Sequence, residues 1–60
     1  MAEFVDTKEY AEGVRAYLFK ISLKLNPYRL EYDAARHMAW RAGWVYEREQ
    51  TYLRGEFNGR

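Results

Sequence analysis

The chain has 60 residues, no cysteine, one histidine and a net charge of +1, which indicates a single domain without disulfides or thiolate metal sites. A domain of this size is marginally stable alone, and self-association or a larger partner is a usual remedy. The sequence contains neither an apolar run of the roughly 18–20 residues needed to span a bilayer nor a signal-peptide pattern at its start. We therefore expect a cytoplasmic protein with no cofactor and no membrane contact.

The first predicted element is an amphipathic helix over about residues 7–25. Asp6-Thr7-Lys8-Glu9 is a capping-box pattern in which Asp6 is the cap. Apolar residues then recur at spacings of three and four, at Ala11, Val14, Leu18, Ile21 and Leu25. Gly13 costs this helix up to about 1 kcal/mol against Ala. A glycine inside a helix often lets another backbone come close, so Gly13 is a candidate contact point.

A corner follows at residues 26–31. Pro27 disfavours the helical region for the residue before it and has no N–H to continue the ladder, so Asn26-Pro27 ends the first helix. We expect Tyr28 and Leu30 to pack against the helices and fold the chain back.

The second helix is predicted over about residues 32–54, with Asp33 as its cap and Gly55 as its stop. It is apolar on two faces, one formed by Ala35, Met38, Ala42, Val45 and Leu53, and the other by Trp40 and Trp44. The predicted fold is all-α, a two-helix antiparallel hairpin forming one domain over residues 1–60. One neighbouring helix covers only one of the two faces. The other is then open to a second copy or another partner, unless the corner and the N-terminal segment fold over it.

The charges divide along the chain. Residues 1–14 carry a net charge of −3, whereas residues 15–29 carry +4 and no acid. Acids at a helix start and bases at its end complement the helix dipole, which is one interpretation. A basic patch that binds a partner is the other, and the sequence leaves both open.

Catalysis has few candidate residues. Ser22 is the only serine, and it lies within the first predicted helix. His37 could pair with Asp33, but this spacing on a helix is more typical of a surface contact than of half a catalytic triad. The four glycines are too scattered to form a phosphate-binding loop. The sequence therefore predicts a protein that is not an enzyme.

Aromatic and basic residues gather around the corner and the start of the second helix. The predicted partner- or RNA-binding residues are Lys20, Lys24, Tyr28, Arg29, Arg36, Trp40, Arg41 and Trp44. Such a mixture stacks unpaired bases and holds phosphates, but it is also typical of protein–protein hot spots. A helix-turn-helix DNA reader is a third possibility, although that motif normally needs a third helix.

An early helix with an inner glycine, an X-Pro-Tyr corner, then an arginine and Trp-x-x-Gly-Trp resembles the bacterial ribosome modulation factor family and similar small phage and prophage proteins. The resemblance covers about residues 10–48, and the matching positions are Gly13, Asn26, Pro27, Tyr28, Arg36, Trp40, Gly43 and Trp44. It implies a two-helix, non-enzymatic, cytoplasmic protein that binds the small ribosomal subunit near the messenger exit region. There it would touch ribosomal RNA and protein, block initiation and promote dimers of inactive ribosomes.

By the same resemblance, Tyr28, Arg36, Trp40 and Trp44 would form the scaffold of the binding element. Arg15, Lys20, Lys24 and Arg29 are candidate phosphate contacts on charge alone. The chain departs from the strongly basic namesake in being nearly neutral. The alternative function is a phage- or prophage-encoded inhibitor of a host protein complex, such as a polymerase, nuclease or defence system. It would act through an aromatic protein–protein interface.

Overall fold

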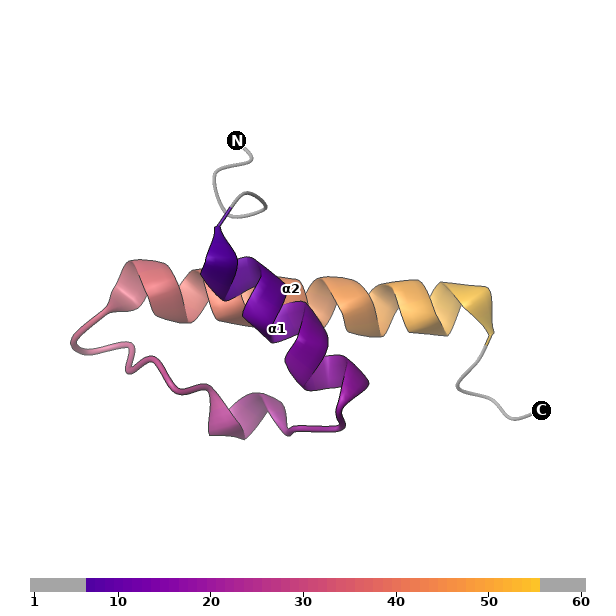
Figure 1. Cartoon of the computed structure of the whole chain (residues 1–60), viewed down its shortest axis with the longest axis horizontal. Coiled ribbons are helices and arrows are strands. Elements are labelled where there is room, and N and C mark those ends of the chain that lie inside the picture. Colours follow the sequence, from indigo (N-terminus) through magenta and orange to yellow (C-terminus); the bar gives the residue numbers. More distant parts are fainter. Residues whose placement is uncertain (1–6, 56–60) are drawn as a thin grey trace.

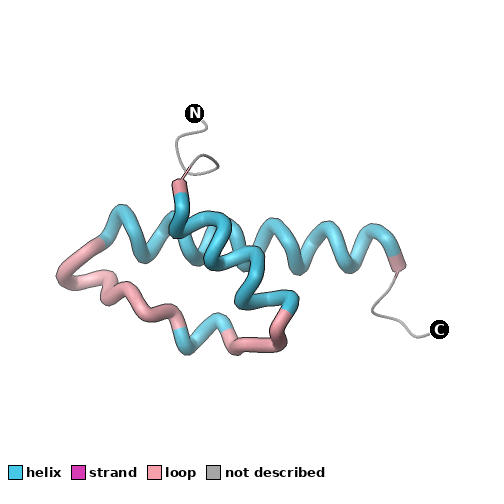
Figure 2. The backbone as a smooth tube through the Cα atoms, in the orientation of Figure 1, coloured by secondary structure: helices cyan, strands magenta, loops and turns pink. Residues whose placement is uncertain are grey.

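The computed structural model describes residues 7–55, which fold into two α-helices joined by a long connection (Figure 1). Helix α1 spans Lys8–Leu18, the short 3-10 helix η2 spans Leu23–Leu25, and helix α2 spans Ala34–Arg54. No strand occurs in this part of the chain, and loop surrounds η2 on both sides (Figure 2). The prediction of an all-α helical hairpin is therefore confirmed.

The N-cap residue of helix α1 lies one position later in the chain than the predicted cap. Thr7 is the N-cap residue, and its Oγ1 accepts a hydrogen bond from the Tyr10 N–H at 3.1 Å. Thr is a good cap because its hydroxyl satisfies one of the first free N–H groups of a helix. Asp6, the cap that the sequence pattern indicated, lies outside the described residues.

Helix α1 ends at Leu18, so the prediction of a helix to about residue 25 was wrong. Lys20 adopts a left-handed backbone conformation with φ 63°. The Lys20 N–H donates to the Tyr17 carbonyl at 3.0 Å, and the Ile21 N–H donates to the Ala16 carbonyl at 2.9 Å. These two bonds form a Schellman C-cap. Lys20 occupies the left-handed position of this motif, which is usually a glycine. Ile21 and Leu25 continue the apolar spacing past this stop, although both side chains are exposed.

Replacing Lys20 with glycine is expected to stabilise the fold. A left-handed conformation costs a non-glycine residue about 1–2 kcal/mol, whereas the extra backbone freedom of glycine costs about 0.5–1 kcal/mol. Lys20→Gly should therefore raise the free energy of unfolding by about 0.5–1 kcal/mol, measured by urea denaturation. Lys24→Gly is the matched control, and it should lower stability because Lys24 has no positive φ. A loss of stability in Lys20→Gly would contradict the left-handed turn.

The antiparallel partner of α2 is the connection, not α1, which corrects the predicted alignment of the two helices. Ile21 of the connection contacts Trp44, and Tyr28, further along it, contacts His37. The connection therefore runs back along α2 towards its N-terminus. Helix α1 lies obliquely across α2 and runs towards the same end of the molecule (Figure 1). The 15 residues from 19 to 33 are long enough to make this return, which a tight turn is not.

The two helices cross at a pair of glycines. A Cβ atom on Gly13 would lie 1.9 Å from the Trp40 carbonyl oxygen, and a Cβ atom on Gly43 would lie 2.0 Å from the Tyr10 carbonyl oxygen. Each glycine therefore lets the backbone of the other helix come into direct contact. The close approach expected at Gly13 is confirmed, and Gly43 is its counterpart on α2.

The tryptophan side of α2 faces α1. Trp40 is 3% exposed, and with Ala16 and Ala39 it makes up the buried apolar core of residues 7–55. The opposite side of α2 remains open within these residues. Met38 is 48% exposed, Tyr46 is 50% exposed and Leu53 is 75% exposed. The sequence allowed either face of α2 to pack against α1. In the described residues, the uncovered face is the one formed by Ala35, Met38, Ala42, Val45 and Leu53, with Tyr46 at its side, which we call the Ala/Met face.

The ends of α2 match the prediction in position. Asp33 is the N-cap residue, but its carboxylate makes no capping bond to the backbone. It pairs with Arg36 instead, at 2.9 Å. Gly55 ends the helix in the left-handed conformation, with φ 79°, which only glycine adopts without strain.

Candidate nucleic-acid interface

Polar side chains fix the corner onto α2. The Asn26 side-chain oxygen accepts from the Tyr28 N–H at 3.0 Å, and its Nδ2 donates to the His37 carbonyl at 3.1 Å. The His37 Nδ1 atom lies 2.8 Å from the Tyr28 carbonyl oxygen. Because a carbonyl only accepts, the proton of neutral His37 is on Nδ1. The Asn26 Nδ2, which is 3.2 Å from the same ring nitrogen, then bonds the His37 carbonyl rather than the ring. His37 is thus a structural residue, and it does not pair with Asp33.

Tyr28 also ties the corner to α1. Its hydroxyl donates to the Glu12 carboxylate at 2.6 Å. This hydrogen bond, together with desolvation and the negative charge of Glu12, raises the pKa of Tyr28 to about 12. Tyr28 therefore contributes to the fold as predicted, whereas Leu30 is 53% exposed and does not pack in the corner.

Removing the Tyr28 hydroxyl is expected to cost stability in a pH-dependent way. Tyr28→Phe should lower the free energy of unfolding by about 1 kcal/mol at pH 8, because it removes a charge-assisted hydrogen bond at a half-buried site. The folded-state pKa of Tyr28 is about 12, above the value of 10.0 for an isolated tyrosine. The contribution of the hydroxyl is thus complete below about pH 10 and is lost as pH rises towards 12.

Urea midpoints of both proteins at pH 8 and at about pH 11.5 test this dependence. The gap between wild type and Tyr28→Phe should narrow at the higher pH. Comparison of the two proteins is needed because burial and the nearby Tyr46 and Glu47 also raise the pKa of Tyr10. A gap that stays constant would contradict the Tyr28–Glu12 bond.

Arg36 is committed to the fold. Its guanidinium bonds Asp33 at 2.9 Å and Glu9 of α1 at 3.2 Å. The hydrogen bond to Asp33 and the negative charges of Asp33 and Glu9 raise the pKa of Arg36. Arg36 thus joins the start of α2 to α1, and two carboxylates already neutralise its charge.

The structure separates the other predicted binding residues into two groups. Arg29 pairs with Glu31 at 3.6 Å and lies over the Tyr32 ring, while Trp40 is buried under α1. Burial excludes Trp40 from the surface on which it was predicted to act. The second group consists of three cations that make no ion pair within the described part of the chain and of the half-buried Trp44: Lys20, Lys24, Arg41 and Trp44.

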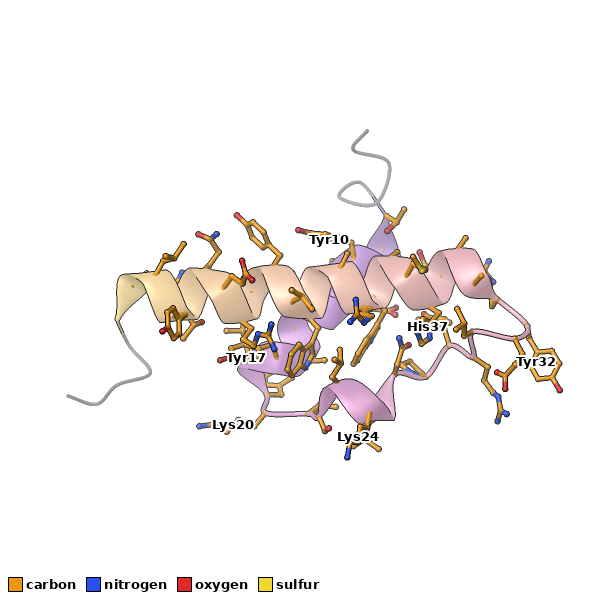
Figure 3. All side chains as sticks on the ribbon, turned by 180° about the vertical axis from the view of Figure 1, so that it is seen from behind. Tyr10, Tyr17, Lys20, Lys24, Tyr32 and His37 are labelled. Atoms are coloured by element: carbon orange, nitrogen blue, oxygen red, sulfur yellow. The ribbon has the colours of Figure 1, made fainter. Side chains whose placement is uncertain are left out.

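A groove brings two of these residues together. It has a volume of about 630 Å³ and lies between the end of α1, the start of the connection and α2. Its lining residues are Tyr17, Leu18, Lys20, Ile21, Ser22, Trp44 and Thr51. Figure 3 shows Tyr17, Lys20 and Lys24 on the side of α2 where the connection runs, with Tyr10 on the other side. We call this the Trp44 groove.

Trp44 is held in a fixed orientation. Its indole N–H donates to the Ile21 carbonyl at 2.8 Å. The Tyr17 and Trp44 ring centroids are 5.2 Å apart, with an interplanar angle of 89°, which is a favourable edge-to-face geometry. The Arg48 guanidinium carbon lies 5.5 Å from the Trp44 ring centroid, within the range of a cation–π contact.

Ion pairing leaves a surplus of positive charge. Within residues 7–55, five of the six acidic residues pair with a base, and only Glu49 does not. Five of the nine basic residues in the same range make no ion pair. These free cations are Arg15, Lys20, Lys24, Arg41 and Arg48. With nine basic and six acidic residues, residues 7–55 carry a net charge of +3, and the cations without an ion pair present this charge to a partner.

Neither Arg48 nor Tyr17 was among the predicted binding residues. A signal for Arg48 was present, since it follows Trp44 by four residues and so lies one helical turn away on the same side of α2. Tyr17 lies in the last turn of α1, and the connection that follows this helix completes the groove beside it.

Comparison with known proteins identifies no relative of this chain. No family model matches it, and neither a curated protein nor a solved structure does. Of the helices in residues 7–55, none is both long enough and apolar enough for a bilayer crossing.

Proposed function

We propose that this chain is a small, non-enzymatic regulatory protein of the cytoplasm that binds ribosomal RNA on the small ribosomal subunit and blocks translation. The proposal follows the resemblance of its Asn-Pro-Tyr and Trp-x-x-Gly-Trp residues to the ribosome modulation factor family.

The observation that carries the proposal is that the ion pairs occupy most acidic residues but leave several basic residues without a partner. Five cations lack an ion pair in the described residues, against one acid. Two of them, Lys20 and Arg48, lie beside the aromatic rings of the Trp44 groove. Unpaired cations next to partly exposed aromatic rings are the chemistry with which proteins hold single-stranded nucleic acid. The near-neutral net charge of the chain is thus compatible with an anionic partner.

The roles of the motif residues support the resemblance. Gly13 and Gly43 form the helix crossing, and Trp40 is buried beneath it. Asn26 and Tyr28 fix the corner. Proteins that share these residues at this spacing have the means to build the same scaffold.

Co-sedimentation with ribosomal subunits through sucrose gradients at low salt tests the proposal. The chain should travel with the small subunit, and inhibition of initiation in a cell-free translation reaction should follow the bound fraction. Nuclease treatment of a bacterial lysate before a pull-down should release the bound ribosomal proteins together with the RNA. A chain that stays at the top of the gradient at low salt would refute the proposal.

The uncovered Ala/Met face of α2 favours a second candidate function. Met38, Tyr46 and Leu53 are at least 48% exposed along one side of this helix, and exposed apolar surface marks interaction sites. A phage- or prophage-encoded inhibitor would dock a host protein there. Its binding should depend little on salt and should be lost in Leu53→Glu, whereas RNA binding should survive that substitution.

A further inference from the structure

We infer that the Trp44 groove is a binding site for one unpaired nucleotide of single-stranded RNA, with the base stacked on aromatic rings and a phosphate held by Lys20 and Arg48. The inference rests on the proposed function for the source of the RNA. It deepens that function by naming the site and its ligand class.

The size and lining of the groove fit a nucleotide. Its volume of about 630 Å³ lies within the range of about 300–1,000 Å³ for small-molecule sites. Tyr17 and Trp44 supply ring surface, and Lys20 supplies a positive charge beside them. No carboxylate of the described residues lines this groove. Arg48 borders the hollow next to the groove on α2, which Glu49, Tyr52 and Leu53 also line.

The groove is organised before any ligand binds. The Trp44 N–H is already bonded to the Ile21 carbonyl, so the indole ring cannot rotate freely. The left-handed turn at Lys20 places both that carbonyl and the Lys20 side chain at the groove. Because the indole N–H is occupied, Trp44 can offer a base only the part of its ring surface that Arg48 and Tyr17 leave uncovered. Recognition should therefore be by stacking and charge, with little preference for base type.

Arg48 lies beside the groove on α2: it contacts the Trp44 ring and borders the neighbouring hollow, without lining the groove itself. Its guanidinium lies over the Trp44 ring and has no carboxylate partner among the described residues. A planar guanidinium can bind a phosphate through two N–H groups or stack on a base. Lys20 and Arg48 thus place two free cations beside the rings of Tyr17 and Trp44. A nucleotide, which joins an aromatic base to a phosphate, can contact both the rings and the cations.

Fluorescence anisotropy with labelled oligonucleotides tests the site. The probes are a 12-nucleotide oligouridylate, the matching oligoadenylate and an abasic strand of the same length. The two strands with bases should bind with similar affinity, and the abasic strand about tenfold more weakly, because it lacks stacking. Equal binding of the abasic strand would overturn the inference.

Variants distinguish the groove from general charge. Lys20→Asn removes the cation but tolerates the left-handed backbone, and Arg48→Gln removes the second cation. Each should weaken oligouridylate binding several-fold while circular dichroism stays that of the wild type. Arg15→Gln is the matched control, because it removes a free cation from α1 that neither lines the groove nor contacts Trp44. If Arg15→Gln weakens binding as much as the groove variants, the inference fails.

The same variants in ribosome co-sedimentation separate this inference from the proposed function. If wild type sediments with the small subunit but the groove variants bind oligonucleotides as well as wild type does, the groove assignment fails and the proposed function stands. If wild type does not sediment but binds oligonucleotides through the groove, the ribosomal function fails and the nucleotide site stands. Sedimentation with no oligonucleotide binding would overturn the groove and indicate a ribosomal protein as the partner.

Discussion

Adding a single methyl group at the helix crossing should destabilise the fold severely. In Gly13→Ala the new Cβ would meet the Trp40 carbonyl oxygen, and in Gly43→Ala it would meet the Tyr10 carbonyl oxygen. Both obstacles are backbone atoms, so the helices have to move apart. We expect each variant to lose about 2–3 kcal/mol or more. This is a large share of the about 3–9 kcal/mol available to 60 residues. Urea denaturation followed by circular dichroism at 222 nm measures the loss.

The local effect of the same substitution has the opposite sign. Alanine is a better helix former than glycine by up to about 1 kcal/mol. A peptide of residues 33–55 carrying Gly43→Ala should therefore gain helix content. Destabilisation of the full chain with stabilisation of the peptide isolates the steric cost of the crossing. If Gly13→Ala and Gly43→Ala stabilise the full chain, the two backbones do not meet where the structure places them.

The two tryptophans should respond very differently to truncation. Trp40 is buried beneath α1, so Trp40→Ala should cost about 3–5 kcal/mol and leave much of the chain unfolded. Trp44 is half-buried, and Trp44→Ala removes one hydrogen bond, one ring contact and the exposed cation–π contact with Arg48. We expect a cost of about 2 kcal/mol there, from about 1 kcal/mol for each of the first two contacts. Urea denaturation of both variants gives the comparison.

Trp44→Phe is the matched control for this pair. It keeps an aromatic ring in the groove but removes the N–H that bonds Ile21, so it should cost about 1 kcal/mol. It should also keep more oligonucleotide binding than Trp44→Ala. If Trp44→Ala destabilises the chain more than Trp40→Ala does, the assignment of Trp40 to the core and Trp44 to the groove is wrong.

The sequence was sufficient to predict the helices but not where the first one ends. Periodic apolar residues, Pro27 and Gly55 indicated two helices and a corner, and the structure has them. The stop after Leu18 was hidden because Lys20 occupies a position where glycine is the usual signal. The apolar spacing of Ile21 and Leu25 then continued the pattern of the helix across the turn. Both residues are exposed, so their spacing reports no buried helix face.

The candidate site was predicted only in part, because ion pairing depends on tertiary contacts. Arg36 was a reasonable RNA contact by sequence, but Glu9 of α1 lies 3.2 Å from it across the helix interface. These residues are far apart along the chain, and no local pattern connects them. Helical periodicity placed Trp40 and Trp44 on one side of α2. It did not indicate that α1 would bury the first and leave the second at the edge of a groove.

The salt dependence of binding to the small ribosomal subunit tests the central claim most directly. On single-stranded RNA, each neutralised phosphate contributes a slope of about −0.7 to a plot of log affinity against log salt. Binding through three or four of the free cations predicts a slope of about −2 to −3 for wild type, reduced by about 0.7 in Lys20→Asn. A flat plot for wild type, or an unchanged slope in Lys20→Asn, would contradict a phosphate contact at this groove.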